Sequence, residues 1–288
     1  MDNLDIIEAV GPSRSKSSND DPDSTNASVK VAFKEIEKVG THTSKLKTLY
    51  ESISAFTQKH GNNPCQMYLG SPKSNSRSMP TDSDIERTAE LIENFAIPYF
   101  THASLCVNLS NPGIAEIGCE TIRTDLKLTS RLGGRGVVFH VGKYTTSSVE
   151  DALDMMEQSI RTILPDATER CPLLLETPAG QGTELCVKVE DMIAFYERFS
   201  IDEAKIFKIC IDTAHIHGAG YEPMEYINKW VAIYGVESVG LIHLNDSKVK
   251  KGAKVDRHAF IGQGFIGTEK LFEVIKWANK HEISMVIE

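Results

Sequence analysis

Several short apolar runs in this sequence each end at a side chain that can bind a metal ion. The run Ile209-Cys-Ile stops at Asp212 and is followed three residues later by His215. Other apolar runs close at a histidine or a glutamate, namely 99–102, 136–140, 173–176, 241–243 and 285–288. Only parallel strands place all their C-terminal ends on one face of a sheet. The repeated pattern therefore predicts a parallel sheet with ligating side chains along one edge.

Strand and helix patterns alternate along the chain. We expect strands at 38–42, 65–69, 98–102, 136–140, 173–177, 207–213, 239–244 and 284–288, with helices between them at 44–58, 82–95, 113–131, 147–163, 186–198, 223–234 and 267–281. Strands that are apolar on both faces are typical of a parallel sheet covered by helices. Eight such units in about 250 residues predict an α/β protein with a (β/α)8 TIM barrel, and a doubly wound open sheet is the alternative.

The two ends of the sequence depart from a complete barrel pattern. Residues 1–28 are rich in Ser, Asp and Pro, which predicts a disordered polar tail ahead of a barrel domain at 29–288. Residues 29–33 fit either a strand or a helix. No helix pattern follows Glu288, so we expect the last barrel helix to be absent from this chain. A fragment of a longer chain is the favoured explanation, ahead of cover by residues 29–33 or self-association through an apolar groove.

The composition limits the partners and the compartment. A formal net charge of −9 argues against a general nucleic-acid coating protein, although bound divalent cations would concentrate positive charge locally. No stretch approaches the roughly 18 apolar residues of a membrane span, and the N-terminus has no signal-peptide pattern. The six cysteines form no CxxC pair, which is typical of reduced thiols. We expect an intracellular protein of the nucleus or cytoplasm, without membrane association and monomeric.

The candidate ligands gathered at or just past the strand ends number nine. A lone histidine after an apolar run is more often a hydrogen-bonded core residue, but five histidines and four carboxylates on one face would repel and be poorly solvated without metal. Imidazole and carboxylate ligands without thiolate favour Zn²⁺, with Mn²⁺ second. Such a cluster fits two or three ions that share a carboxylate and hydrolyse a phosphodiester. The nine residues are His102, His140, Glu176, Asp212, His215, His243, Asp256, His258 and Glu288.

Two features lie between these ligands and the last predicted helix. The loop 248–257 is basic, and we expect Lys248, Lys250, Lys251 and Arg257 to contact phosphates; a solvated loop is the alternative. Residues 262–267 match the pattern GxGxxG. A dinucleotide site needs a strand before that pattern, whereas a ligand-bearing loop precedes it here, so we interpret it as a glycine turn into the next helix.

Four segments closely resemble the endonuclease IV family of apurinic/apyrimidinic (AP) endonucleases, also known as AP endonuclease family 2. The resemblance runs from about residue 40 to the last residue, and all nine candidate positions hold the residue types with which that family binds metal. The segments are Leu175-Glu-Thr-Pro-Ala-Gly-Gln-Gly182, Cys210-Ile-Asp-Thr-Ala-His215, His243-Leu-Asn-Asp-Ser-Lys248, and Asp256-Arg-His258 with Gly262-Gln-Gly264.

The resemblance implies a xylose-isomerase-like barrel with three zinc ions. One ion is expected on His102, His140 and Glu176, a second on Glu176, Asp212, His243 and Glu288, and a third on His215, Asp256 and His258. The carboxylates Glu176, Asp212 and Glu288 are the expected catalytic residues. The implied substrate is double-stranded DNA with an abasic site, which is cut 5′ to the lesion to leave a 3′-hydroxyl.

The chain also departs from the family's pattern. Leu105 stands where many members have a tyrosine that wedges into the duplex, and Arg77 is the candidate for the family's penetrating basic residue. Two other functions stay open. A metal-dependent sugar isomerase or epimerase of the related barrel superfamily would bind one or two ions, and a catalytically silent lesion binder would lack cleavage activity.

Overall fold

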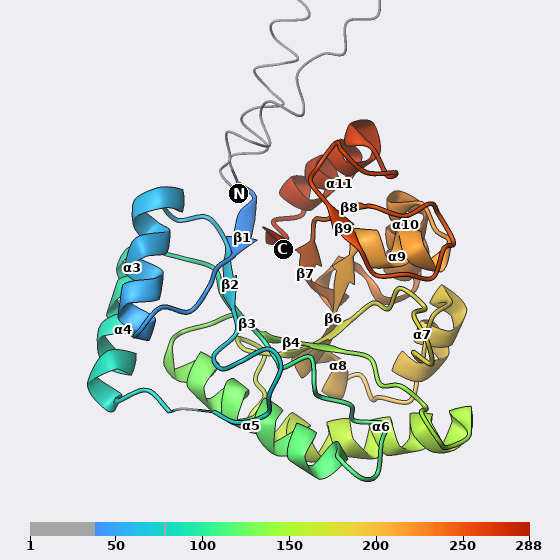
Figure 1. The fold of residues 1–288 in the computed structure, drawn as a ribbon, viewed down its shortest axis with the longest axis horizontal. Helices are drawn as coiled ribbons and strands as arrows, with labels where there is room; N and C mark the ends of the chain where they lie inside the picture. The colour runs from blue at the N-terminus through green and yellow to red at the C-terminus, as the bar shows by residue number, and fades with distance from the viewer. Residues whose placement is uncertain (1–37, 78) are drawn as a thin grey trace, which may run out of the picture.

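Eight parallel strands close into a barrel in the computed structural model, which describes residues 38–77 and 79–288. Figure 1 shows the strands in the centre of the molecule. The order around the barrel is β1-β10-β7-β6-β5-β4-β3-β2, so the first strand pairs with the last. The predicted TIM barrel is confirmed. The strands are β1 Gly40–His42, β2 Cys65–Met67, β3 Tyr99–His102, β4 Val137–His140, β5 Leu173–Glu176, β6 Phe207–Asp212, β7 Val239–His243 and β10 Met285–Ile287.

Helices surround the strands on the outside of the barrel (Figure 1). Several begin at a side chain that caps the first backbone N–H groups: Thr48, Thr81 and Ser148 each accept a hydrogen bond three residues ahead. The expectations for residues 1–28 and 29–33 lie outside the described residues. The covering helices are α3 Leu49–His60, α4 Asp82–Asn94, α5 Ala115–Arg131, α6 Val149–Ile163, α7 Val189–Tyr196, α10 Pro223–Tyr234 and α11 Thr268–Lys280.

The inside of the barrel carries an apolar layer with a polar layer directly above it. Successive side chains along a strand point to opposite faces, so residues two positions apart lie on the same face. The apolar layer takes one residue from each of six strands: Phe100, Val138, Leu174, Cys210, Leu241 and Val286. Two residues further along the same six chain segments stand His102, His140, Glu176, Asp212, His243 and Glu288. The strand period therefore brings six of the nine candidate ligands to one mouth of the barrel.

Some short elements were not predicted from the sequence. Helix α9 (Thr213–Ala219) begins where Asp212 accepts a hydrogen bond from the His215 N–H at 2.8 Å. A two-stranded antiparallel ribbon joins β8 (Asp246–Ser247) to β9 (His258–Ala259), and α8 covers Glu203–Ile206. Elements of two to seven residues are too short to show a hydrophobic period, which explains why they were missed.

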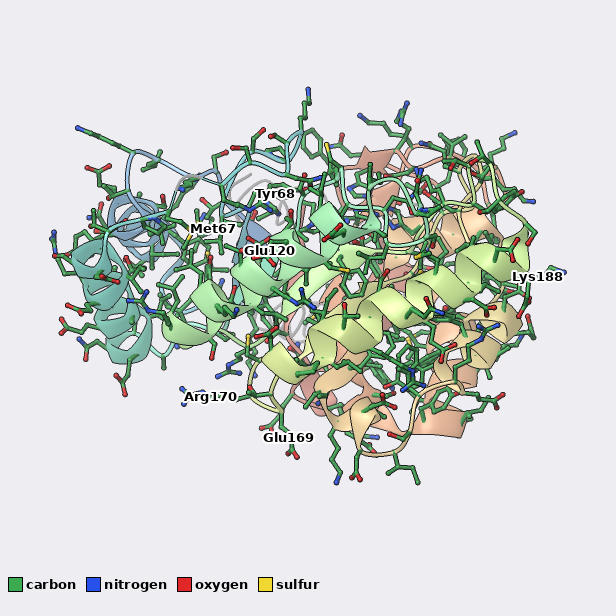
Figure 2. All side chains as sticks on the ribbon, turned by 90° about the horizontal axis from the view of Figure 1, so that it is seen from below. Met67, Tyr68, Glu120, Glu169, Arg170 and Lys188 are labelled. Atoms are coloured by element: carbon green, nitrogen blue, oxygen red, sulfur yellow. The ribbon has the colours of Figure 1, made fainter. Side chains whose placement is uncertain are left out.

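The two mouths of the barrel lie at opposite edges of the molecule. In Figure 2, Tyr68, which follows β2, lies in the upper half of the molecule, and Glu169 and Arg170, which precede β5, lie at its lower edge. All six cysteines are free and five are buried. Within the described part of the chain, every helix is too short or too polar to cross a membrane.

Candidate metal centre

Glu176 lies at the centre of the C-terminal mouth, at the end of β5. Its Oε2 is 3.1 Å from His102 Nε2 and 3.5 Å from His140 Nε2. Its Oε1 is 3.1 Å from His243 Nδ1 and 3.4 Å from His215 Nδ1. The two oxygens thus face different sets of imidazoles, which is the arrangement needed for a carboxylate shared between two ions.

A second group adjoins this carboxylate. His243 Nδ1 is 3.1 Å from Glu288 Oε2 and 3.8 Å from Asp212 Oδ2. The ligand atoms of Glu176, Asp212, His243 and Glu288 all lie within 4.8 Å of one another, as do those of His102, His140 and Glu176. The structure therefore brings together the two sets of residues that the resemblance assigns to the first two ions.

A third group forms where the β8–β9 ribbon meets α9. Asp256 Oδ1 is 3.3 Å from His215 Nε2 and 3.2 Å from His258 Nε2. His258 Nε2 is also 3.6 Å from Asp212 Oδ2. All nine candidate residues are thus part of one continuous cluster, although their function as metal ligands stays a prediction.

Backbone hydrogen bonds orient the buried imidazoles toward this cluster. His102 Nδ1 donates to the Ala103 carbonyl at 2.8 Å, and His215 Nδ1 donates to the Thr177 carbonyl at 2.9 Å. In each neutral ring the lone pair is then on Nε2, which faces the carboxylates. The Nε2 atoms of His215 and His258 are buried and have no hydrogen-bond partner. Unsatisfied ring nitrogens beside carboxylates fit a divalent cation such as Zn²⁺.

Electrostatics at this mouth favour positive charge. Burial alone would raise the pKa of the Glu176 carboxyl, but His140 and His243 and the hydrogen bonds from His102 and His243 hold that pKa well below its usual range. Burial alone would lower the pKa of His215, but Asp212 and Asp256 raise it well above the ordinary value of 6.5. A field that draws protons onto imidazoles would also draw metal ions.

Two amide side chains support the cluster and were missed by the sequence analysis. Gln66 donates to Glu288 Oε1 at 2.8 Å, and its Oε1 lies 2.9 Å from His243 Nε2. Asn245 donates to Asp212 Oδ2 at 2.7 Å and accepts from the Glu288 N–H at 3.0 Å. A signal for Gln66 existed, because it interrupts the buried run Cys65–Met67 with a polar residue. Such partners fix the rotamers of the ligands that they contact.

Arg77 is not placed as the sequence analysis expected. Its Nε and Nη2 donate to the two carboxylate oxygens of Asp125, both at 2.9 Å, and only 8% of its side chain is exposed. The buried Asp125 needs a cation, and the planar guanidinium supplies a two-pronged partner. Its side chain therefore points into the protein. Leu105, by contrast, is 53% exposed on the loop after β3, where it is free to contact a ligand.

The basic loop is exposed beside the third group. Lys248, Lys250, Lys251 and Arg257 all lie at the surface, and Lys251 forms an ion pair with Glu222 at 2.9 Å. Phe260 and Phe265, on the segment that follows, are exposed as well and were not singled out from the sequence. The loop thus offers positive charge and aromatic surface next to the cluster.

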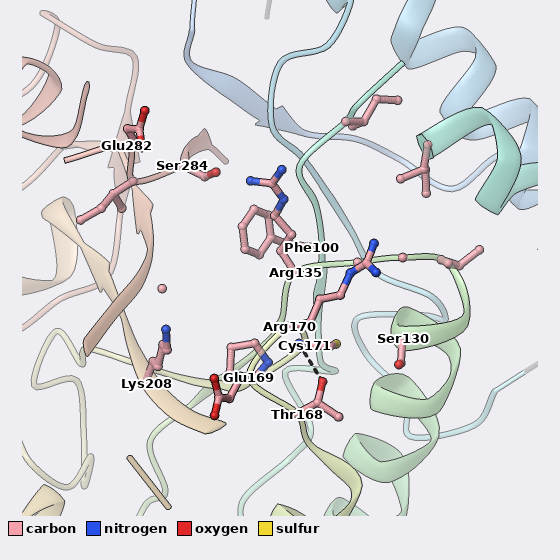
Figure 3. Close-up of a pocket in the computed structure, with 18 of the residues that line it drawn as sticks. Phe100, Ser130, Arg135, Thr168, Glu169, Arg170, Cys171, Lys208, Glu282 and Ser284 are labelled. Carbon is pink, nitrogen blue, oxygen red and sulfur yellow. Dashed lines mark hydrogen bonds between the residues drawn. The ribbon is translucent and has the colours of Figure 1, made fainter. Parts of the chain in front are cut away.

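A cavity of about 810 Å³ lies at the opposite, N-terminal mouth of the barrel. Figure 3 shows Arg135 and Arg170 on one side of it and Lys208 on the other. None of the nine candidate ligands lines this cavity. The ligating chemistry is therefore confined to the C-terminal mouth, as is usual for TIM-barrel active sites.

A closed parallel barrel with a histidine and carboxylate cluster at this mouth is the architecture of the xylose isomerase-like TIM barrels, whose family model matches residues 55–288. The chain is 31% identical to the probable endonuclease 4 of Mycoplasma mobile, over 78% of this chain and 81% of that protein. It is 28% identical to the probable endonuclease 4 of Bacillus licheniformis, over 87% and 86%. Its fold matches the crystal structure of endonuclease IV from Thermus thermophilus, with a TM-score of 0.75, 26% identity and coverage of 87% and 91%. This chain belongs to the endonuclease IV family.

Proposed function

We propose that this protein is a DNA repair endonuclease that hydrolyses the phosphodiester 5′ to an abasic site and leaves a 3′-hydroxyl. The observation that carries the proposal is the convergence of the nine candidate ligands into three adjoining groups at one barrel mouth. The names of the relatives support a nuclease acting on DNA. A sugar isomerase or epimerase with one or two ions would have no use for the third group.

The proposed cofactor is three zinc ions, for which Mn²⁺ can substitute. His102, His140 and Glu176 would hold the first, and Asp212, His243 and Glu288 would share Glu176 to hold the second. His215, Asp256 and His258 would hold the third. When bound, such ions act as Lewis acids toward the phosphate and lower the pKa of a water molecule toward neutral.

The chain's own residues prepare this mouth for a phosphate. Hydrogen bonds to backbone carbonyls hold the His102 ring with Nε2 toward Glu176 and the His215 ring with Nε2 toward Asp256 before any ligand arrives. Asn245 keeps one oxygen of Asp212 occupied at 2.7 Å, which leaves the other oxygen for the cap of α9. Fixed orientation lowers the entropy that must be lost when substrate is positioned.

DNA contacts outside the metal centre are assigned to the exposed loops. We assign Lys248, Lys250, Lys251 and Arg257 to phosphates that flank the lesion and Leu105 to the opened duplex; the support for this is that all five are exposed. Arg77 is left out of this assignment, because reaching DNA would break its paired hydrogen bonds to Asp125.

The test is a nicking assay on a duplex oligonucleotide with one abasic site. We expect a single cut 5′ to the lesion, a 3′ end that a DNA polymerase extends, and loss of cutting with a chelator until zinc or manganese is restored. The same duplex with an intact base is the control. Protein that carries three zinc ions per chain and leaves the abasic strand intact would refute the proposal in favour of a silent lesion binder.

A further inference from the structure

The glycine pattern at 262–267 surrounds a buried carboxylate of the protein itself. Asp246, the first residue of β8, is fully buried. Its Oδ1 accepts from the N–H groups of Ser247 at 2.8 Å and Ile266 at 3.0 Å. Its Oδ2 accepts from the N–H groups of Gly262 and Gly264, each at 3.0 Å. We call these four donors and the carboxylate the Asp246 cradle.

The glycines are required by the geometry of the cradle. Gly262 has a φ of +80°, a conformation that residues with a side chain disfavour. A Cβ at Gly264 would lie 2.4 Å from Asp246 Oδ1 and 2.5 Å from the Ser247 carbonyl oxygen, closer than atoms can approach. Among residues 38–77 and 79–288, Asp246 has no cation in an ion pair, so the four N–H groups are what compensates its burial.

The cradle fastens the ribbon that carries the third ligand group. Asp246 pairs with Ala259 and Ser247 with His258 in the β8–β9 ribbon, and the Lys248 N–H donates to the Arg257 carbonyl at 2.8 Å. The Phe265 N–H donates to the Ser247 carbonyl at 2.8 Å. The returning strand is thus held against β8 by the pairing and by the turn that encloses the carboxylate.

The third group needs this support more than the other two. Six ligands stand at the ends of the barrel strands or directly after β10, where the barrel's hydrogen bonds fix the backbone. Asp256 and His258 belong instead to the ribbon and its loop, and 37% and 23% of their side chains are exposed. Beyond the ribbon, the backbone of Asp256 is held only by side chains: its N–H donates to Gln181 Oε1 at 3.1 Å, and its carbonyl accepts from Nη1 of the exposed Arg257 at 2.6 Å.

We propose that Asp246 is a positioning residue for the third metal ion. Its carboxylate holds the 260–266 turn against β8 and so fixes Asp256 and His258 relative to His215. The effect on an ion rests on the proposed function, whereas the ordering of the turn does not. The two parts are therefore measured separately.

The test is Asp246→Asn, which keeps the size of the side chain but replaces one acceptor oxygen with an NH₂ group. Whichever way the amide turns, two backbone donors lose their acceptor. In the metal-free protein we expect hydrogen exchange of the Gly262, Gly264 and Ile266 amides to accelerate while the barrel strands stay protected. On titration with Zn²⁺ we expect one ion of three to bind roughly 10-fold more weakly, the low end of the effect of losing a direct partner of a ligand, because Asp246 acts on Asp256 and His258 only through the turn.

Asp125→Asn is the matched control, because it also alters a fully buried carboxylate but lies away from the ribbon. It should leave both readouts at the turn and the third ion unchanged. If Asp246→Asn does not fold, Gly264→Ala tests the same contact, since its methyl group meets the carboxylate from the other side.

Three unchanged zinc affinities in Asp246→Asn, or exchange that accelerates in the strands as much as in the turn, would overturn the positioning role. Failure of the proposed function gives a different result. Wild-type protein would then bind fewer than three ions, and the part of the proposal that concerns the third ion would be refuted. Accelerated hydrogen exchange limited to residues 262–266 in Asp246→Asn would still establish that the cradle orders the ribbon.

Discussion

The two mouths of the barrel are built by the same strands but differ in whether their charged side chains are buried and in contact with one another. At the C-terminal mouth, carboxylates and imidazoles are buried within 3.1–3.8 Å of one another. At the N-terminal mouth, Arg135, Arg170 and Lys208 line an open cavity and form no ion pair within the described residues. Strand β6 supplies both ends, with Lys208 near its start and Asp212 at its end. Burial and mutual contact, rather than the number of charges, make one mouth reactive.

The largest expected difference between the mouths is in catalysis. Glu176→Gln keeps the shape of the side chain but removes the charge that two ions would share, so we expect AP-site cleavage to fall by several orders of magnitude. Lys208→Gln, on the other mouth, should cut at the wild-type rate. The readout is kcat/KM on the abasic duplex. A Glu176→Gln enzyme with more than about a tenth of the wild-type value would contradict the assignment.

The second difference is in the response of stability to pH. In the metal-free protein, the pKa values of His102 and His215 are raised. Their contribution to the free energy of unfolding is therefore complete below the unfolded pKa of 6.5 and is lost as the pH rises through the folded pKa. The pKa values of Glu176 and Glu288 are lowered. Their contribution to the free energy of unfolding is therefore present above the unfolded pKa of 4.5 and is lost as the pH falls through the folded pKa. The metal-free protein should therefore melt at a lower temperature at pH 8 than at pH 6.

Zinc should reverse this dependence of the melting temperature on pH. Binding to imidazole displaces protons, so the zinc-loaded protein should melt at a higher temperature at pH 8 than at pH 6. Thermal melts of stripped and reloaded protein at both pH values provide the measurement, with Lys208→Gln as the control that keeps the wild-type slopes. Parallel slopes with and without zinc would show that the cluster does not exchange protons for metal.

The smallest effect is expected on DNA affinity. Lys250→Ala with Lys251→Ala should weaken binding and reduce the salt dependence of log K by up to roughly one unit for each lost phosphate contact. Most of the change should come from Lys250, because Lys251 is paired with Glu222 at 2.9 Å. Arg135→Ala with Arg170→Ala removes two charges from the other mouth and should leave the salt slope as it is. Equal effects of the two double variants would show that the basic loop is only solvated.

The sequence was informative where local periodicity and position coincide. Alternation along a strand places His102 two residues above Phe100 and Glu176 two above Leu174, so a ligand type at the end of an apolar run could be assigned to the barrel interior. The fold class follows from the same alternation of strands and helices.

What the sequence did not reveal depends on pairs far apart along the chain. Gln66 meets Glu288 across 222 positions, and Arg77 meets Asp125 across 48. A polar residue inside the run Cys65–Met67 marks Gln66 as unusual, but no local pattern identifies the partner of either residue, since each contact arises only when the barrel closes and its loops pack. The Arg77 prediction misplaced the side chain for this reason: a basic residue in a polar loop has the same appearance in sequence whether it faces solvent or a buried aspartate.

Glu176 reaches imidazoles on β3, β4 and β7 and on the helix after β6 with a single carboxylate. An aspartate at this position would withdraw that carboxylate by one carbon–carbon bond, about 1.5 Å, and would loosen all of these contacts at once. The distance from the barrel wall to its axis therefore selects between two acids of the same charge. The side-chain length at the end of β5 is therefore matched to the distance between the barrel wall and the histidines that surround Glu176.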